Sequence, residues 1–148
     1  MASVIVRGGI GSLEQEVLVG RHRLTADEPE GQGGHDAGPS PYDYLLAALG
    51  TCTSMTLALY ARRKGWPVEG ITVTLAHSRI HATDCAECET KDGHIDRIDR
   101  EIGLAGPLTE EQRTRLLEIA ERCPVHRTLT AEVNIRTRLA SPAGGRGS

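Results

Sequence analysis

Apolar residues recur with two different periods along this chain, and the change of period separates predicted strands from predicted helices. Branched apolar runs broken by glycines, or apolar residues that alternate with polar ones, are typical of antiparallel strands. Six segments show one of these patterns, and we predict strands at 4–6, 17–19, 22–25, 71–75, 98–104 and 133–139. The segment 98–104 also fits a helix, because Ile95, Ile98 and Ile102 recur at helical spacing.

The longest apolar segment follows Ser40 and predicts a central helix. Ser40 suits the N-cap, Pro41 the first helical position and Asp43 the third position of a capping box. The helix is expected to end after Arg62-Arg63-Lys64, at Gly65-Trp66-Pro67. Apolar residues occupy nearly every face of this segment, so we expect the helix to be buried on all sides.

A second helix is predicted from Thr109, which forms a capping box with Gln112, to Cys123 before Pro124. Strands and helices then follow the order β-β-β-α-β-β-α-β. Because this order lacks regular strand–helix–strand repetition, the predicted fold class is α+β. We expect one domain over residues 1–140 and a disordered Gly/Pro/Ser tail over 141–148.

Composition and charge argue against several classes of partner and cofactor. The net charge of −3 comes from interspersed signs, so neither nucleic acid nor an anionic membrane is an expected partner. The N-terminus lacks the features of a signal peptide, and no apolar run reaches the roughly 18 residues of a membrane span. We therefore expect a cytoplasmic protein, in which a disulfide would be catalytic or sensory. The glycine-rich segment 27–38 matches no phosphate-binding motif, so no cofactor is expected.

Two distant cysteines, Cys52 and Cys123, are the main candidates for chemistry. Taken alone, each fits a small buried apolar residue, and a reactive Cys52 would need a cation close to it. The start of its own helix is about three turns away, so we consider Arg21 and Arg23 as sources, although both also fit exposed strand residues. Together the two thiols suggest redox chemistry, because a sulfenic acid on one could condense with the other.

A second group of candidate ligands, His81, Cys85, Cys88 and His94, lies between two predicted strands. Zinc uses such residues, but the histidine spacing is not that of a zinc finger. Acidic neighbours would raise the pKa values of these thiols. A zinc site, a surface redox pair and incidental loop cysteines all remain open, and we do not include a metal in the expected site.

Two motifs, in this order, resemble the OsmC/Ohr family of thiol-dependent peroxidases: Leu45-Leu46-Ala47-Ala48-Leu49-Gly50-Thr51-Cys52 and Cys123-Pro124-Val125-His126. The resemblance extends from about Arg21 to Leu139. It implies an intertwined homodimer in which antiparallel sheets wrap around two central helices. It also implies organic hydroperoxide substrates, a peroxidatic Cys52, a resolving Cys123 and an activating arginine, for which we choose Arg21 with Arg23 as the fallback. An external dithiol, lipoyl-type or other, would then restore the thiols.

The chain departs from the family pattern at one position. Active relatives often carry a glutamate at the start of helix one, where it pairs with the arginine, and the equivalent residue here is Tyr42. Asp43 could replace it or could only cap the helix. The alternative function is therefore a redox-responsive or ligand-binding protein of the same fold with little peroxidase turnover.

Overall fold

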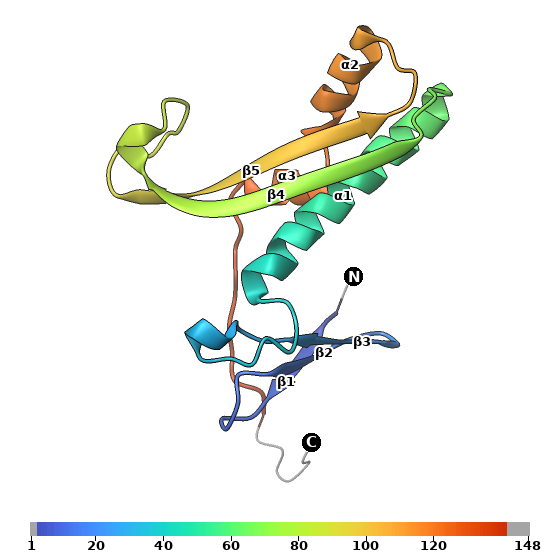
Figure 1. Cartoon of the computed structure of the whole chain (residues 1–148). Coiled ribbons are helices and arrows are strands. Elements are labelled where there is room, and N and C mark those ends of the chain that lie inside the picture. Colours follow the sequence, from blue (N-terminus) through green and yellow to red (C-terminus); the bar gives the residue numbers. More distant parts are fainter. Residues whose placement is uncertain (1–2, 142–148) are drawn as a thin grey trace.

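The structure, a computed structural model, describes residues 3–141 and has an α+β fold with two antiparallel sheets, as predicted (Figure 1). In chain order the strands and helices are β1 (Ile5–Gly8), β2 (Gln15–Val19), β3 (His22–Ala26), α1 (Pro41–Lys64), β4 (Gly70–His81), β5 (His94–Ala105), α2 (Glu110–Ala120) and α3 (Pro124–Leu129). Two short 3₁₀ helices, η1 (Glu30–Gln32) and η2 (Ala82–Asp84), lie in loops.

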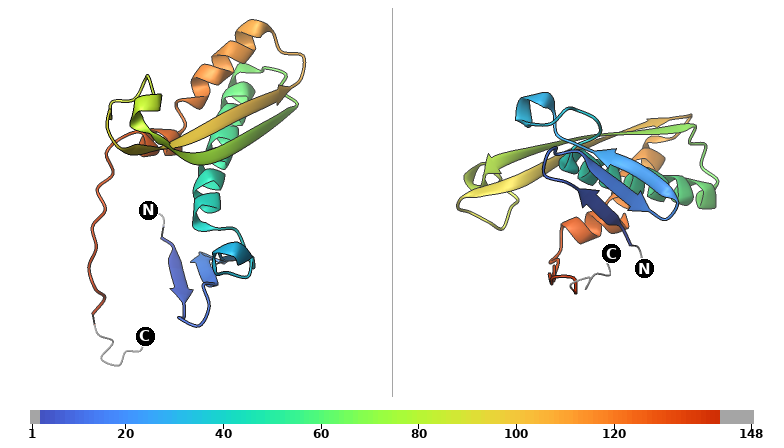
Figure 2. Two further views of the ribbon diagram at one scale, coloured as in Figure 1. Left: turned by 60° about the vertical axis from the view of Figure 1, so that its left-hand side comes forward. Right: turned by 90° about the horizontal axis from the view of Figure 1, so that it is seen from below.

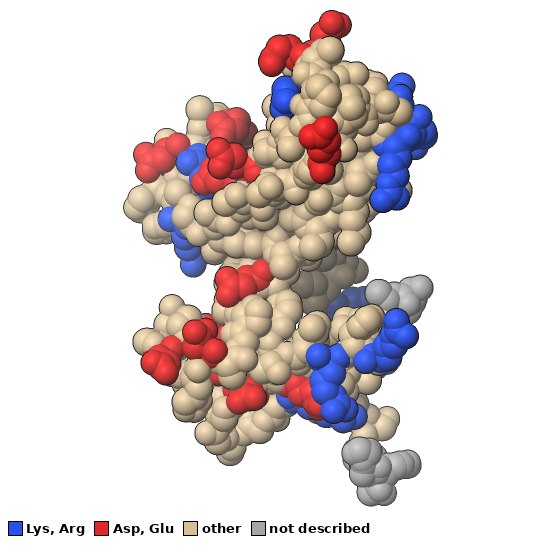
Figure 3. Space-filling model, turned by 45° about the vertical axis from the view of Figure 1, so that its right-hand side comes forward, with Lys and Arg blue, Asp and Glu red and all other residues tan. Residues whose placement is uncertain are grey.

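The three N-terminal strands form a separate small sheet in the order β1-β2-β3. Its register pairs Val17 with both Val6 and Leu24. Figures 1 and 2 show this sheet at the N-terminal end of α1, away from α2 and α3. The face shown in Figure 3 carries acidic and basic side chains at several separate places on both parts of the molecule.

Helix α1 begins as its sequence predicts. The backbone N–H of Asp43 donates to the Ser40 hydroxyl (3.2 Å), and the N–H of Ser40 donates to the Asp43 carboxylate (2.9 Å). The helix ends at Gly65, whose φ of 70° is the left-handed conformation that glycine adopts without strain. Both predicted ends of this helix are confirmed.

The prediction that α1 is buried on all sides is wrong for a single chain. Among the described elements, β4, α2 and α3 pack most extensively on α1, and the buried residues Leu49, Thr53 and Leu57 lie on that side. On the opposite side Met55 is 65% exposed and Leu59 is 61% exposed. By length and composition alone, α1 is also long and apolar enough to cross a membrane, a test that core helices of folded domains pass as well. The side facing β4, α2 and α3 nevertheless packs as the core helix of a folded domain does.

Strands β4 and β5 form one long hairpin that crosses α1, and both are longer than predicted. Gly50 allows the close crossing, because a Cβ at this position would lie 2.8 Å from the Leu75 side chain. The core lies between the hairpin and the helices, and its buried members are Leu57, Tyr60, Leu116, Ile119 and Ala120. The hairpin thereby fixes how α1 and α2 pack against each other.

The second predicted helix is in fact two helices. Helix α2 ends at Ala120, and Cys123 is the N-cap of α3, which begins at Pro124. Proline lacks the N–H that an interior helix position needs but fits the first turn of a new helix. Cys123 therefore lies at the start of a helix and not at the end of one.

The strand predicted at 133–139 is also wrong for a single chain. Residues 131–141 are extended but pair with no strand among the residues that the structure describes (Figure 2). Alternation made the segment suitable for a strand, but within the described residues it joins neither of the two sheets. Residues 142–148 of the predicted tail lie outside the described part of the chain.

Asp27 organises the loop that joins the small sheet to α1. It is 2% exposed and accepts hydrogen bonds from the backbone N–H groups of Glu28 (2.8 Å), His35 (3.0 Å) and Ala37 (3.1 Å). The bond from Ala37 lowers the pKa of Asp27 most; burial opposes this shift, and the bonds from His35 and Glu28 add to it. The folded loop therefore favours the ionised carboxylate.

This arrangement makes one part of the stability depend on pH. Because the pKa of Asp27 is lower in the folded chain than its ordinary value of 3.8, its contribution is complete above that value and is lost as the pH falls through the folded pKa. We expect Asp27→Asn to destabilise the chain at neutral pH and to remove this acid dependence. Chemical denaturation at pH 7 and below pH 4 tests it, with Asp36→Asn, an exposed carboxylate in the same loop, as the control. Equal loss of stability at both pH values would contradict the assignment.

Candidate functional site

The structure brings the two candidate cysteines together where α1 meets α3. Cys52 lies midway along α1 and is half-buried, whereas Cys123 is completely buried at the N-cap of α3. Both are free thiols, and Thr53, the neighbour of Cys52 on α1, has its hydroxyl 3.9 Å from the Cys123 sulfur. Two residues 71 positions apart in sequence thus form one dithiol site.

Cys123 is the thiol whose charged form this chain stabilises. Burial raises the pKa of Cys123, but hydrogen bonds to the sulfur outweigh burial, so the pKa lies below its ordinary value of 9.0. The largest of these bonds comes from the backbone N–H of His126 at 3.3 Å, followed by those from Cys52 and Thr53. These bonds therefore make Cys123 easier to ionise than an ordinary cysteine, and they would also make it a better leaving group from a disulfide.

A buried arginine that the sequence analysis missed contacts two residues, Thr53 and His126, that lie next to the Cys123 sulfur. The Arg100 side chain on β5 is 10% exposed. Its guanidinium donates to the Thr53 hydroxyl (2.9 Å), to the Glu121 carboxylate (3.2 Å) and to Nδ1 of His126 (3.1 Å). The Thr53 hydroxyl in turn lies 3.9 Å from the Cys123 sulfur. Arg100 thus fixes the group next to Cys123 and supplies the site with a positive charge.

These contacts determine which nitrogen of neutral His126 carries the proton. Arginine can only donate, so Nδ1 of His126 must accept from Arg100. The proton of the neutral ring is then on Nε2, which lies 3.5 Å from the second carboxylate oxygen of Glu121. Arg100, Glu121 and His126 therefore form a closed polar ring at the N-terminal end of α3.

A sequence signal for Arg100 exists. On β5 the residues that face the helices are Ile98, Arg100, Ile102 and Leu104, so one arginine interrupts an apolar row. A charged residue on an inward face needs partners. The partners Thr53, Glu121 and His126 come from two other segments, so the row alone could indicate a buried cation but not where it lies.

Within one chain, the structure does not bring Arg21 to Cys52. Arg21 lies in the turn between β2 and β3, in the small sheet, and Arg23 forms an exposed ion pair with Glu16 (3.1 Å). Cys52 lies about 17 Å along α1 from its first residue, at 1.5 Å per residue. The choice of Arg21 as the activating cation therefore depends on a second copy of the chain.

Tyr42 and Asp43, at the position where active relatives carry a glutamate, have structural roles in this chain. The Asp43 carboxylate accepts from the N–H of Ser40, as the capping interpretation predicts. Tyr42 is 54% exposed and stacks on His77 with 4.4 Å between ring centroids. Neither side chain contacts a thiol or Arg100 in the described part of the chain.

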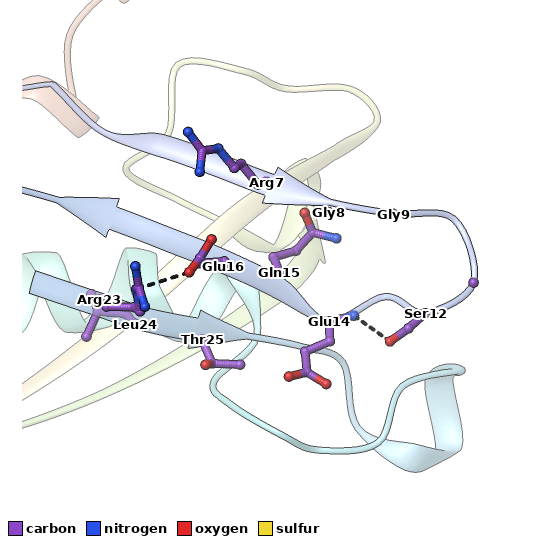
Figure 4. A pocket seen from close by; sticks show the side chains of 11 residues that line it. Arg7, Gly8, Gly9, Ser12, Glu14, Gln15, Glu16, Arg23, Leu24 and Thr25 are labelled. Carbon is purple, nitrogen blue, oxygen red and sulfur yellow. Dashed lines mark hydrogen bonds and ion pairs between the residues drawn. The ribbon is translucent and has the colours of Figure 1, made fainter. Parts of the chain in front are cut away.

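An open hollow of about 650 Å³ lies on the small sheet, remote from the thiols (Figure 4). Residues at its rim include Arg7, Ser12, Gln15, Glu16 and Arg23, and Arg23 and Glu16 pair across β2 and β3. It contains no cysteine, and we do not assign chemistry to it.

The second cysteine pair is a disulfide at the tip of the β4–β5 hairpin. Cys85 and Cys88 are bonded to each other, and the rings of His81 and His94 lie 4.2 Å apart at the base of the tip. Bonded sulfurs are not thiolate ligands. Among residues 3–141, no cluster of three or more potential ligand side chains has an arrangement that could hold a metal ion.

Thr53 gives a direct test of the environment of Cys123. We expect Thr53→Val, which keeps the shape but removes the hydroxyl, to raise the pKa of Cys123 and to slow its alkylation at neutral pH roughly fivefold, as the loss of one hydrogen bond of about 1 kcal/mol implies. Thiolate absorbance titration and timed alkylation in a Cys52→Ser background measure both. Thr51→Val on the exposed side of α1 is the control. An unchanged Cys123 titration would show that Thr53 does not stabilise the thiolate.

Comparison with known proteins gives a consistent result. The family model described as OsmC-like protein matches residues 33–138. An OsmC-like protein from Mycoplasma pneumoniae is 20% identical with a TM-score of 0.69, over 87% of this chain and 86% of that one. An organic hydroperoxide resistance protein from Legionella pneumophila is 19% identical with a TM-score of 0.65, over 88% and 89%.

The organic hydroperoxide resistance protein OhrB of Bacillus subtilis is 18% identical with a TM-score of 0.61, over 90% of this chain and 93% of that one. At these identities the solved structures establish a shared fold. None of the curated protein sequences matches this chain significantly.

Proposed function

The chain belongs to the OsmC-like protein family, as its two motifs predict, and from this premise we propose that it is a thiol-dependent peroxidase that reduces organic hydroperoxides. In this proposal Cys52 is peroxidatic and Cys123 is resolving. The observation that carries the proposal is the placement of these two free thiols at the junction of α1 and α3, where the residue next to Cys52 lies 3.9 Å from the Cys123 sulfur. The names of the Legionella and Bacillus proteins agree with this substrate class.

The chemistry proceeds in three balanced steps. The Cys52 thiolate attacks the outer peroxide oxygen, the O–O bond breaks, and an alcohol leaves after taking a proton. The resulting Cys52 sulfenic acid condenses with the Cys123 thiolate, and hydroxide leaves and is protonated to water. An external dithiol then exchanges with the Cys52–Cys123 disulfide and is itself oxidised.

The difference between the two thiols supports this division of roles. Cys52 is the more accessible sulfur, which suits attack on a substrate. Cys123 is buried, and its thiolate is stabilised, so it is ready to attack the sulfenic acid as soon as that forms. Its lowered pKa also makes it the better leaving group when the external dithiol attacks Cys52.

We further propose that the active form is a homodimer. Within one chain, the apolar surfaces that lack a cover include one side of α1 at Met55 and Leu59, Leu117 on α2, and the extended segment 131–141. In that segment Ile135 is 82% exposed and Leu139 is 95% exposed. A second copy could cover α1 and pair with the extended segment, and it would also be the source of Arg21.

The dimer can be tested through Ile135. We expect the wild-type chain to have twice its mass of 15.9 kDa in solution, because the apolar side of α1 needs a cover. Ile135→Lys should weaken the dimer at least about tenfold, since it places a charge among apolar side chains. Asn134→Lys adds the same charge on the alternate face of the segment and is the control. Light scattering over a concentration series decides: a monomeric wild-type chain, or equal effects of both variants, would contradict the proposal.

A second candidate function is a redox-responsive protein with little turnover. The observation that favours it is the absence of a free carboxylate at Tyr42 and Asp43, because Asp43 is used as a helix cap. Steady-state assays of the reduced protein with cumene hydroperoxide, hydrogen peroxide and dihydrolipoate separate the two. Sustained consumption of cumene hydroperoxide supports the peroxidase, whereas formation of one disulfide without turnover supports the sensor.

A further inference from the structure

The tip of the β4–β5 hairpin contains a cysteine pair that the peroxidase chemistry does not use. Beyond α1 the two strands continue to their last pair, His81 and His94, and the loop between them carries the Cys85–Cys88 disulfide (Figure 1). Figure 2 shows this loop at the free end of the hairpin, beyond the helices. The loop that carries the pair is therefore at one end of the molecule, and residues 86, 87 and 89–94 in it are exposed.

The Cys85–Cys88 disulfide is not needed to hold the β4–β5 hairpin together. The hairpin is already closed by a continuous ladder from Gly70–Ala105 to His81–His94, and Ala82 N–H donates to the Gly93 carbonyl (2.8 Å) just beyond it. Cys85 and Cys88 are three residues apart, and the stabilisation from a disulfide grows with the length of chain it closes. The bond joins no separate elements, so a structural role does not account for it.

The two sulfurs differ in accessibility, as thiol–disulfide exchange requires. Cys85 is 4% exposed, and its backbone N–H donates to the Ala82 carbonyl (3.1 Å). Cys88 is half-buried, between the exposed residues Glu87 and Glu89. An external thiolate can therefore reach Cys88, and Cys85 is the shielded sulfur that leaves.

The charges around the pair favour the disulfide over free thiolates. Asp84, Glu87 and Glu89 lie in the same loop and are exposed. Carboxylates close to a thiol raise its pKa. A couple whose thiolates are destabilised gives up its electrons more readily, so the reduced pair would act as a reductant more than as an oxidant.

The pair is also separate from the proposed peroxidatic site. Arg100 contacts Thr53 and His126 beside Cys123, and His94 is six residues away along β5. Six residues of strand span about 20 Å. The tip disulfide therefore does not exchange directly with Cys52 or Cys123 of the same chain.

From this geometry we propose that Cys85 and Cys88 form a second redox site, which exchanges thiols with external dithiols through Cys88. A thiolate of the dithiol attacks the Cys88 sulfur, the Cys85–Cys88 bond breaks, and its electron pair leaves on Cys85, which takes a proton. The second thiol of the donor then attacks the donor sulfur of the mixed disulfide and releases Cys88. Two electrons and two protons reach the pair, and the donor becomes a disulfide.

The full-length Cys52→Ser/Cys123→Ser variant isolates this site, since only the tip cysteines remain. It is equilibrated under native conditions with mixtures of dihydrolipoate and lipoate, quenched with acid and alkylated, and its peptides are weighed. We expect one reversible two-electron transition in which both tip cysteines change together. The peroxidase reaction is not measured, so this result is independent of the proposed function.

Two further variants in the same background test whether Cys88 is more accessible than Cys85. Cys85→Ser should capture lipoate or oxidised glutathione as a mixed disulfide at Cys88 at least about tenfold faster than Cys88→Ser does at Cys85, because only Cys88 is accessible. The proposal is overturned by equal capture rates, by a disulfide that dihydrolipoate reduces only after denaturation, or by thiols that stay reduced at every lipoate ratio. One zinc ion bound per reduced chain would also overturn it and would instead favour a metal site with His81 and His94.

Discussion

Replacing Cys52 by serine should abolish peroxide consumption, with a fall of at least about 1000-fold in the rate with cumene hydroperoxide. A serine hydroxyl does not ionise near neutral pH and cannot form a sulfenic acid, so the first step of the proposed reaction is lost. The fold should survive, since Cys52 is half-buried and serine is smaller than cysteine. The measurement is peroxide loss in the presence of excess dihydrolipoate.

The matched control for this variant is Thr51→Ser, one residue earlier on α1. Thr51 is exposed, and its hydroxyl bonds only to carbonyls of its own helix, at 2.8 Å to Ala47 and 3.2 Å to Ala48, which serine can also do. Wild-type turnover by Thr51→Ser would show that the loss belongs to the thiol. Equal, slow peroxide consumption by wild type and Cys52→Ser would refute the assignment of Cys52.

Replacing Cys123 by serine should have a different and equally large effect. Cys52 would still react with the first equivalent of peroxide, but its sulfenic acid would lack a thiol to condense with. We expect one fast turnover, then loss of activity as Cys52 gains a second oxygen atom and becomes a sulfinic acid. Excess peroxide should inactivate this variant while the wild type, supplied with dithiol, continues.

Rapid-mixing kinetics followed by mass measurement of the Cys52 peptide tests this prediction. A single equivalent of peroxide should yield sulfenic acid, which a dimedone-type reagent traps, and excess peroxide should yield sulfinic acid. If Cys123→Ser continues to turn over at the wild-type rate, Cys123 is not the resolving thiol. If instead it fails to react even once, Cys123 is the thiol that attacks peroxide, and the two roles are exchanged.

An exchange of roles, with Cys123 as the thiol that attacks peroxide, has a physical basis in the structure. Within one chain, the hydrogen bonds that stabilise a thiolate converge on Cys123, and Arg100 lies on that side of the site. Among the described residues, the bonds of Arg100 go to Thr53, Glu121 and His126 and not to Cys52, so the proposed roles need the second copy to bring Arg21. The Cys123→Ser experiment therefore also tests whether a dimer completes the site.

Local signals in the sequence predicted the local structure well. Both capping boxes, at Ser40 with Asp43 and at Thr109 with Gln112, formed as expected. They could be predicted because each depends on residues only three positions apart. The small sheet and the β4–β5 hairpin followed in the same way from alternation and turns.

The wrong predictions concern features that depend on contacts between distant parts of the chain or with another chain. Pro124 was expected to interrupt a helix, but it begins α3, and this places Cys123 at a helix start. The segment 133–139 alternates correctly for a strand, yet a strand also needs an edge to pair with, and no pattern within the segment supplies one. The exposed side of α1 was expected to be buried for a related reason, since hydrophobicity indicates that a surface is covered but not by which chain.

The site was predictable only in part. The motifs identified Cys52 and Cys123, but the closed ring of Arg100, Glu121 and His126 joins three segments and has no contiguous motif. Arg100 could have been suspected from its place in an apolar row of β5. Its partners depend on how the hairpin crosses α1, which only the tertiary structure determines.

The most direct test of the peroxidase proposal is the fate of Cys52 and Cys123 after one equivalent of cumene hydroperoxide. The fully reduced wild-type protein is mixed with the peroxide without any reductant, alkylated and digested, and its peptides are weighed. The proposal predicts one molecule of alcohol per chain and a disulfide that joins the Cys52 and Cys123 peptides. Peroxide that remains unconsumed while both thiols are alkylated, or oxidation confined to Cys85 and Cys88, would contradict it.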